Sequence, residues 1–237
     1  GSPTDLTMAL LKGATNNSAQ VFEDTRVSSF GFNKDSSKIT SVTTESGHTI
    51  EATNVVIAAG QWSRQLAAKA GVNVPLHSAE HFYATTQKPL PGVWNMMPVM
   101  RDPDGLVYFR EWGTQLCFGG FETEAKPWGA VADGGVPEDF EFALLPDDVD
   151  HFMPLYEGSA QRFPGLEAAE VKLLNGPESF TPDGNYILGE TPNVNNLFVC
   201  AGMNSSGIAS AGGAGKALSE WIVNGEPMTD LAAIDIR

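Results

Sequence analysis

Apolar residues recur at a helical spacing near the start of the chain and then gather in short runs. Leu6, Ala9, Leu10 and Ala14 lie three or four positions apart, which predicts a helix over 4–15. The runs that follow have the pattern of β-strands, with turn residues between them. We expect strands at 20–23, 26–33 and 39–44.

A continuous apolar run, V-V-I-A-A-G, occupies 55–60. Runs of this kind are typical of a strand that is covered on both faces. The residues that follow it, 61–70, have a helical pattern. The chain up to about residue 70 therefore indicates part of a layered α/β domain.

The middle of the chain has a different pattern, in which strand-like pieces are separated by Pro, Gly and Asp. This punctuation predicts an antiparallel sheet. The strands we expect are 81–86, 106–110 and 115–118. We expect a loop at 126–137, which is rich in Gly and Pro, and a helix at 147–163 whose first turns are interrupted by Pro154.

The last part returns to strand, loop and helix. A strand at 197–200 leads into a Gly- and Ser-rich loop at 202–207, and a helix of small residues follows at 208–223. A loop of backbone N–H groups at a helix N-terminus can hold a phosphate or an electron-rich oxygen. A tight packing junction between strand and helix explains the same spacing, so the pattern alone leaves both interpretations open.

Composition narrows the class of protein. The chain has 237 residues and a net charge of −15, which argues against binding to nucleic acid or to an anionic membrane surface. No apolar run approaches the length of a membrane span and no secretory signal is present, so we expect a cytoplasmic location. Cys117 and Cys200 lie far apart, and neither has metal-ligand spacing around it, so we expect two reduced thiols and no metal site.

Several motifs, in the same order along the chain, resemble the D-amino-acid-oxidase-like FAD oxidoreductases. They are N-G-P-E-S-F-T-P-D-G at 175–184, V-V-I-A-A-G-Q-W-S at 55–63, M-R-D-P-D-G-L-V-Y-F-R-E at 100–111 and W-I-V-N-G-E-P at 221–227. The branch they most resemble is that of the sarcosine and dimethylglycine dehydrogenases. The resemblance implies an α/β fold with an antiparallel β insert. A partial FAD-binding domain, 1–77 and 179–237, would be split around a sheet-rich substrate domain, 78–178.

One motif of these families is missing. They hold the ADP part of FAD with an N-terminal G-x-G-x-x-G, and the nearest match here, Gly213-Ala214-Gly215, has Leu218 where the third glycine belongs. We therefore expect the chain to be a piece of a longer polypeptide that binds FAD weakly by itself. A natural shortened homologue is the alternative. The resemblance also implies folate as a further cofactor, through a region beyond Arg237, and an electron-acceptor protein as a partner.

His81 and Tyr83 alternate on a predicted strand, so their side chains lie on the same face. An imidazole and a phenol there could take or relay the proton of an amine substrate, since only the free amine can donate a hydride to flavin. The resembling dehydrogenases have a His-x-Tyr pair on a substrate-domain strand near the flavin. A packed histidine beside a hydrogen-bonded tyrosine is the structural alternative.

Arg101 and Arg110 flank a predicted hairpin turn. An arginine fork suits a substrate carboxylate. Asp102, Asp104 and Glu111 are adjacent, however, and local salt bridges explain the arginines more simply.

The resemblance assigns flavin contacts to ten residues. They are Val27, Ala59, Gly60, Trp62, Gly202, Asn204, Ser205, Ser206, Gly207 and Ile208. Val27 would contact the adenine side, and packing is the simpler role for Trp62. The loop from Gly202 would face the pyrimidine end, where N–H donors and the helix dipole stabilise negative charge on reduced flavin.

The resemblance thus implies FAD-dependent oxidation of an N-methylated amino acid such as sarcosine or dimethylglycine. Two alternatives stay open, a non-catalytic regulatory or interaction homologue and an inactive fragment of the enzyme.

Overall fold

The computed structural model describes residues 2–129 and 135–237. The chain divides into two compact units, each with its own core. Unit 1 comprises Gly1–Leu76 and Thr181–Arg237, and unit 2 comprises His77–Phe180. The boundary falls where β5 and β9 begin and end, because His77 pairs with Phe180 in the β5–β9 ladder.

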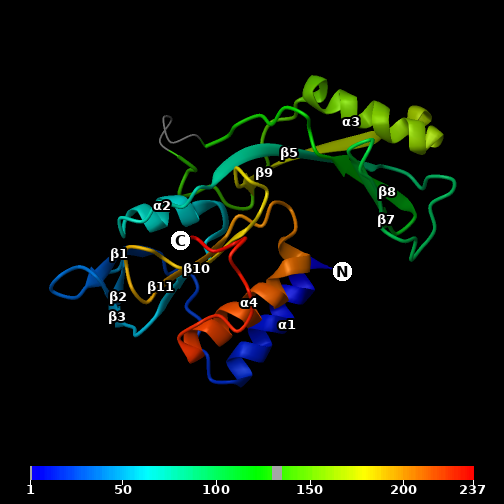
Figure 1. Ribbon diagram of the computed structural model, residues 1–237. Helices are drawn as coiled ribbons and strands as arrows, with labels where there is room; N and C mark the ends of the chain where they lie inside the picture. Colours follow the sequence, from blue (N-terminus) through cyan, green and yellow to red (C-terminus); the bar gives the residue numbers. More distant parts are fainter. Residues whose placement is uncertain (1, 130–134) are drawn as a thin grey trace. The chain divides into compact units, whose positions relative to one another are not determined.

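Unit 1 begins with helix α1, Pro3–Asn16, close to the bounds expected from its apolar spacing (Figure 1). Ser2 caps α1 by accepting the N–H of Asp5, and Pro3 occupies the first helical position, where its missing N–H costs nothing. No residue of α1 is buried, and Met8 and Leu10 are more than half exposed. The helical period is therefore present without a covered apolar face.

Two sheets belong to unit 1. Strands β1 (Val27–Phe32), β2 (Ile39–Thr44) and β3 (Thr49–Glu51) form an antiparallel sheet in that order. The second sheet has the order β10 (Ile187–Glu190), β11 (Leu197–Ala201) and β4 (Val55–Ile57), with β11 and β4 parallel. Its core includes Ile57, Leu197 and Val199.

Helices follow both strands of the parallel pair. After β4 come a 3-10 turn, η1 (Gly60–Trp62), and helix α2 (Ser63–Ala68), and after β11 comes α4 (Gly207–Asn224). The buried Trp221 of α4 packs against Phe198 of β11, with ring centroids 6.1 Å apart.

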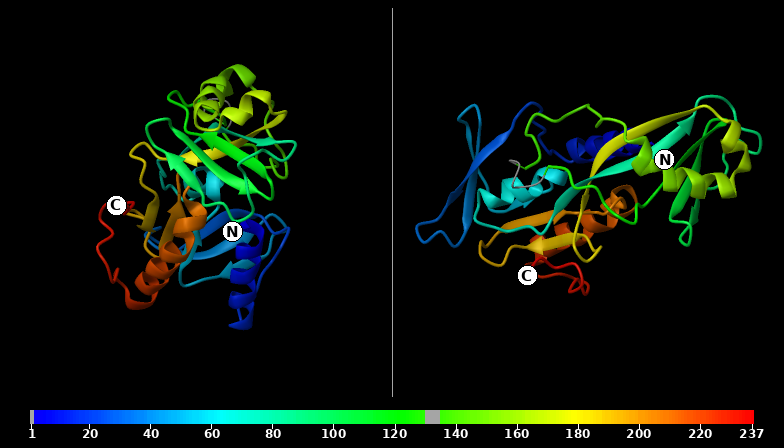
Figure 2. Two further views of the ribbon diagram at one scale, coloured as in Figure 1. Left: turned by 90° about the vertical axis from the view of Figure 1, so that its right-hand side faces the viewer. Right: turned by 90° about the horizontal axis from the view of Figure 1, so that it is seen from above.

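Unit 2 is a five-stranded antiparallel sheet in the order β6-β7-β8-β5-β9. The strands are β5 (His77–Thr86), β6 (Met100–Asp102), β7 (Val107–Trp112), β8 (Gln115–Gly120) and β9 (Val171–Phe180). Helix α3 (Val149–Arg162) runs along this sheet and leads into a 3-10 turn, η3 (Pro164–Ala168), as Figures 1 and 2 show. Asp148 caps α3 by accepting the N–H of His151 at 3.0 Å.

Three expectations from the sequence were wrong. Residues 20–23 form no strand: all four are exposed, and they belong to none of the sheets of the described residues. Pro154 lies inside α3 without interrupting it. The run at 55–60 is a strand only as far as Ile57, and Val56 is 41% exposed rather than covered on both faces. Of the loop expected at 126–137, residues 130–134 lie outside the described part.

Candidate functional site

Three strands of unit 2 align two tyrosines on either side of a glycine. Tyr83 of β5 and Tyr108 of β7 each pair with Gly119 of β8, and Arg101 of β6 pairs with Tyr108. Residues that stand directly opposite each other in a sheet have their side chains on the same face. Arg101, Tyr108 and Tyr83 therefore form one row across the sheet.

The same face carries two more of the candidate residues from the sequence. His81 lies two positions before Tyr83, and Arg110 lies two positions after Tyr108, so both share the face of the row. The opposite face is packed: Phe82, Phe109 and Phe118 are buried in a cluster with residues of α3. We call the set that faces away from α3 the polar face, and it consists of His81, Tyr83, Arg101, Tyr108 and Arg110.

His81 is bound by a carboxylate that follows β8. Its Nδ1 lies 3.3 Å from Oε2 of Glu122, and the two side chains are 12% and 9% exposed. The other oxygen, Oε1, accepts the N–H of Phe82 at 3.3 Å. The imidazole ring also contacts the rings of Phe121 and Phe180, with centroids 5.2 and 5.9 Å away. His81 is thus held in one orientation from several sides.

Burial raises the pKa of both tyrosines on the polar face. For Tyr83 the Cys117 thiol adds to the effect of burial, and Arg110 opposes it. For Tyr108 the nearby Cys117 and Glu122 push the pKa further up. Both phenols therefore keep their protons at neutral pH and can donate hydrogen bonds, but they cannot act as bases there.

The expected local salt bridges of the two arginines were wrong. Asp102 instead binds Arg162 of α3 and caps its own turn by accepting the N–H of Gly105 at 3.1 Å. In the described part, Arg101 lies over the ring of Phe121 and Arg110 over that of Trp112, at 4.9 and 4.8 Å.

The guanidinium of Arg110 is not fully hydrogen-bonded within the protein. Its Nε is buried and has no hydrogen-bond partner among the described residues. A buried cationic donor without an acceptor is costly. Arg110 therefore has one buried N–H donor that no acceptor among the described residues satisfies.

Tyr108 and Glu122 were not among the candidates from the sequence. Tyr108 lies two positions before the candidate Arg110 on the strand expected at 106–110, so strand alternation already placed both on one face and could have identified Tyr108. Glu122 lies 41 positions from His81 and beyond the end of its strand, so no local pattern connects the two.

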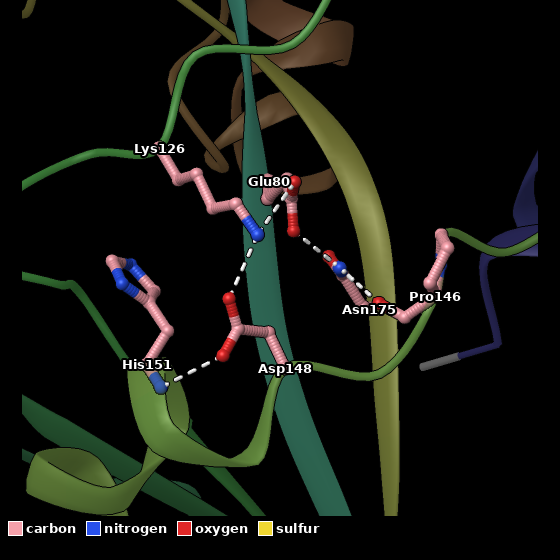
Figure 3. Close-up of polar contacts among 6 residues, drawn as sticks. All are labelled: Glu80, Lys126, Pro146, Asp148, His151 and Asn175. Carbon is pink, nitrogen blue, oxygen red and sulfur yellow. Dashed lines mark hydrogen bonds and ion pairs between the residues drawn. The ribbon is translucent and has the colours of Figure 1, made fainter.

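A network of charged and polar side chains lies beside the start of β5 (Figure 3). Nζ of Lys126 lies 3.2 Å from Oε1 of Glu80 and 2.7 Å from Oδ2 of Asp148. Nδ2 of the buried Asn175 donates to Oε2 of Glu80 at 2.6 Å and to the carbonyl of Pro146 at 2.8 Å. The network connects Lys126, Pro146 and Asp148 to strands β5 and β9. Its residue on β5, Glu80, directly precedes His81.

In unit 1 the glycine-rich loop between β11 and α4 is held by Asn204. Nδ2 of Asn204 donates to the Gly202 carbonyl at 2.7 Å and to Oγ1 of Thr181 at 3.0 Å. Oδ1 of Asn204 accepts the N–H of Thr181 at 2.9 Å. Gly202 has φ +68°, and a β carbon there would lie 2.6 Å from Thr181, so this position requires glycine. Thr181 and Asn204 therefore fix the loop to the turn of T-P-D-G.

The loop enters α4 with an unusual backbone. Asn204 and Ser205 have φ angles of 48° and 62°, so two successive non-glycine residues are left-handed. Ser206 is the N-cap of α4 but makes no capping hydrogen bond with its side chain. The first N–H groups of the helix, from Gly207 and Ile208 onward, have no acceptor within the helix. They form a set of donors at the positive end of the helix dipole.

The remaining candidates lie elsewhere in unit 1. Gly60 begins η1 with φ +55° and open space where a β carbon would be, next to Ala59, whose N–H donates to Oγ of Ser63 at 3.1 Å. Trp62 is half-buried at the end of η1, and Val27 begins β1 opposite Thr44. The structure brings Gly202, Asn204, Ser205, Ser206, Gly207 and Ile208 together in one loop and Ala59, Gly60 and Trp62 in another.

The described residues contain no cluster of three or more His, Cys, Asp or Glu side chains that could hold a metal ion. No helix in the same residues is long and apolar enough to span a membrane.

The chain matches the family of FAD dependent oxidoreductases over residues 2–221, and it belongs to that family. It is 38% identical to the mouse (Mus musculus) mitochondrial pyruvate dehydrogenase phosphatase regulatory subunit, covering 100% of this chain and 26% of that protein. It is 37% identical to mouse mitochondrial sarcosine dehydrogenase, covering 99% of this chain and 25% of that protein.

A similar fold occurs in the crystal structure of L-proline dehydrogenase from P. horikoshii. The TM-score is 0.80 at 20% identity, and the match covers 99% of this chain and 59% of that one. The chain spans about a quarter of the length of the two mouse relatives.

Proposed function

We propose that this chain forms part of a FAD-dependent enzyme that oxidises the C–N bond of an N-methylated amino acid such as sarcosine or dimethylglycine. The observation that carries the proposal is the polar face, where His81 and Tyr83 lie beside two arginines on a sheet whose other face is packed. Membership of the family and the 37% identity to mouse sarcosine dehydrogenase support it.

The loop residues fit the cofactor. The donors at the start of α4, with Gly202 and Asn204 before them, would hold the pyrimidine end of the flavin, and Gly60 and Val27 would contact the rest of the molecule. When bound, FAD would supply the acceptor for a hydride from the N-methyl carbon of the substrate. The N–H groups of Gly207 and Ile208 would stabilise negative charge at the pyrimidine end of the cofactor, because the helix already orients them.

His81 and Tyr83 act on the amine. A secondary ammonium has no lone pair to assist hydride loss, so its proton must leave first, and His81 is the acceptor. Tyr83 stays protonated because burial raises its pKa, so it orients the amine as a hydrogen-bond donor.

The products follow from the balance of atoms. The neutral N-methyl amine loses a hydride and becomes a methylene iminium. Water adds to it, the C–N bond breaks, and formaldehyde and the protonated primary amine leave when sarcosine is the substrate. Transfer of the one-carbon unit to folate would replace the water step, and an electron-acceptor protein would accept the electrons in a dehydrogenase.

Arg110 and Arg101 are the residues we propose for the substrate carboxylate. Arg110 has a buried Nε without a partner, which a carboxylate oxygen would satisfy. Arg101 lies in the same face, over Phe121. An amine that carries a carboxylate would thus be held at one end by arginine and at the other by His81 and Tyr83.

Anaerobic mixing of the FAD-loaded full-length protein, of which we propose this chain is a part, with sarcosine or dimethylglycine tests the proposal. We expect the absorbance of oxidised flavin to disappear with either substrate and to persist with glycine, which has no N-methyl group. Persistence with all three would overturn the proposed function.

That outcome would favour the second candidate, a non-catalytic regulatory homologue. The 38% identity to the pyruvate dehydrogenase phosphatase regulatory subunit is the observation behind it. The distinguishing result is FAD that is bound in stoichiometric amount but is not reduced by any N-methylated amino acid.

A further inference from the structure

We infer that Glu122 is a positioning residue for His81: its carboxylate keeps the imidazole proton on Nδ1 and leaves Nε2 free to accept a proton. This inference rests on the proposed function for the role of His81 in the reaction. The tautomer of His81 can be measured without substrate or flavin, so the inference about Glu122 and the proposed function can fail separately.

The carboxylate of Glu122 contacts two successive residues of β5. Oε2 lies 3.3 Å from Nδ1 of His81, and Oε1 accepts the N–H of Phe82 at 3.3 Å. Both side chains of the pair are close to fully buried, at 12% exposure for His81 and 9% for Glu122. Because the strand itself fixes Oε1, the other oxygen has a defined place opposite the ring.

This arrangement determines which ring nitrogen carries the proton. An ionised carboxylate can only accept hydrogen bonds, so the nitrogen that faces it must be the protonated one. A neutral imidazole with its proton on Nδ1 has a lone pair on Nε2, and among the described residues no hydrogen bond to Nε2 occurs. In a neutral His81 the proton acceptor is therefore Nε2.

The aromatic neighbours restrict the ring further. Phe121 and Phe180 contact the imidazole at centroid distances of 5.2 and 5.9 Å. A ring flip that placed Nε2 toward Glu122 would have to break the contact with the carboxylate and repack between these two rings. The tautomer and the orientation are thus set together.

Replacing Glu122 by glutamine distinguishes control of the His81 tautomer from a role in which Glu122 only holds the imidazole ring in place. The side-chain amide of Gln offers one acceptor and one donor group, while Phe82 N–H and His81 Nδ1–H both require acceptors. If the amide oxygen takes the Phe82 N–H, the NH₂ group faces Nδ1 and the proton must move to Nε2. Glu122→Asp keeps two acceptor oxygens and is the conservative variant.

The test is ¹⁵N NMR of the histidine side chains, carried out where the rings are neutral. The chain has four histidines, so loss of one signal in His81→Asn identifies the relevant ring. We expect the Nδ1–H tautomer in the parent and in Glu122→Asp, and the Nε2–H tautomer in Glu122→Gln. Glu124→Gln, a change at an exposed carboxylate two residues away, is the matched control and should leave the signal of His81 unchanged.

Flavin reduction gives the second measurement. We expect Glu122→Gln to slow reduction at saturating sarcosine on the order of 10–100-fold, with partial recovery in Glu122→Asp. A parental tautomer in Glu122→Gln would overturn the inference. A changed tautomer with an unchanged rate would confirm the action of Glu122 on His81 and refute the proposed role of His81 in the reaction.

Discussion

The phenol of Tyr108 lies directly over Gly119, in the space that a β carbon of that residue would fill. A β carbon there would be 2.6 Å from Oη of Tyr108 and 2.8 Å from the Phe82 carbonyl. Tyr83 pairs with Gly119 from the other side. The missing side chain of Gly119 is therefore the reason that two half-buried phenols can lie near each other on the polar face.

Gly119→Ala should destabilise the protein, because Tyr108 and the carbonyl of Phe82 leave no room for the methyl group. Overpacking of this kind costs about 1–3 kcal/mol in the free energy of unfolding. Gly176→Ala in the same sheet is the control, since its β carbon would meet only Leu144 at 4.0 Å. Urea unfolding of both variants measures the difference, and equal stability would show that Tyr108 moves aside freely.

Much of the secondary structure could be predicted, because the spacing of apolar and β-branched residues close in sequence indicates helices and strands. The helical period of Leu6, Leu10 and Ala14 predicted α1 to within a few residues, and the β-branched run at 39–44 matches β2. Alternation was enough to place His81 and Tyr83 on one face. Such patterns depend on residues close in sequence, and they report the period of the backbone whatever packs against it.

The contacts that define the site depend on residues far apart, and these could not be predicted. The sequence predicted a local salt bridge for Asp102, but Asp102 binds Arg162, which lies 60 positions away on α3. Glu122 reaches His81 only because β8 and β5 are adjacent in the sheet. Which strands pair, and which loop side chain reaches across them, is decided by packing of the whole unit rather than by local spacing.

Gly207 offers a test of the loop between β11 and α4. A β carbon at Gly207 would meet only Met203, at 3.6 and 3.8 Å, so the protein itself has room for a larger side chain. Gly207→Val should therefore fold normally but lose flavin-dependent activity, because the branched side chain blocks close approach of a ligand to the backbone.

Thermal unfolding of Gly207→Val checks the folding, and FAD titration with a measurement of flavin reduction in the full-length variant checks the loss of activity. Ser219→Val, an exposed change later in α4, is the control for the effect of valine on the helix. Unchanged FAD affinity and activity in Gly207→Val would identify the loop as a packing junction.

Asp148 should make the stability depend on pH. The hydrogen bond from Lys126, with that from the His151 N–H, lowers the pKa of Asp148 below its usual value. A carboxyl group whose pKa is lower in the folded state stabilises the fold above its unfolded pKa of about 3.9. That contribution is lost as the pH falls through the folded pKa.

Asp148→Asn should consequently be less stable than the parent at neutral pH and approach it in acid. Unfolding measured at both pH values, with the exposed Asp147→Asn as the control, tests this. A difference between parent and Asp148→Asn that is the same at both pH values would show that the charge of Asp148 contributes nothing.

The last prediction concerns the chemistry of the polar face. If His81 takes the amine proton and Tyr83 orients the amine, His81→Asn and Tyr83→Phe should each slow flavin reduction by N-methylglycines, on the order of 10–1000-fold. The rate in the parent should rise with pH, because only the bound amine that has lost its proton can donate a hydride. Because burial raises the pKa of Tyr83, loss of its proton cannot account for a rise near neutral pH.

Anaerobic stopped-flow reduction across a pH series measures these rates. Thr85→Val is the matched control, since Thr85 lies on the same face of β5 two positions beyond Tyr83. FAD content should stay near the parental value in all three variants, because the flavin-holding residues we propose are in unit 1 and the changes are in unit 2. Parental rates in both His81→Asn and Tyr83→Phe, with sarcosine and with dimethylglycine, would make the pair structural and strengthen the regulatory alternative.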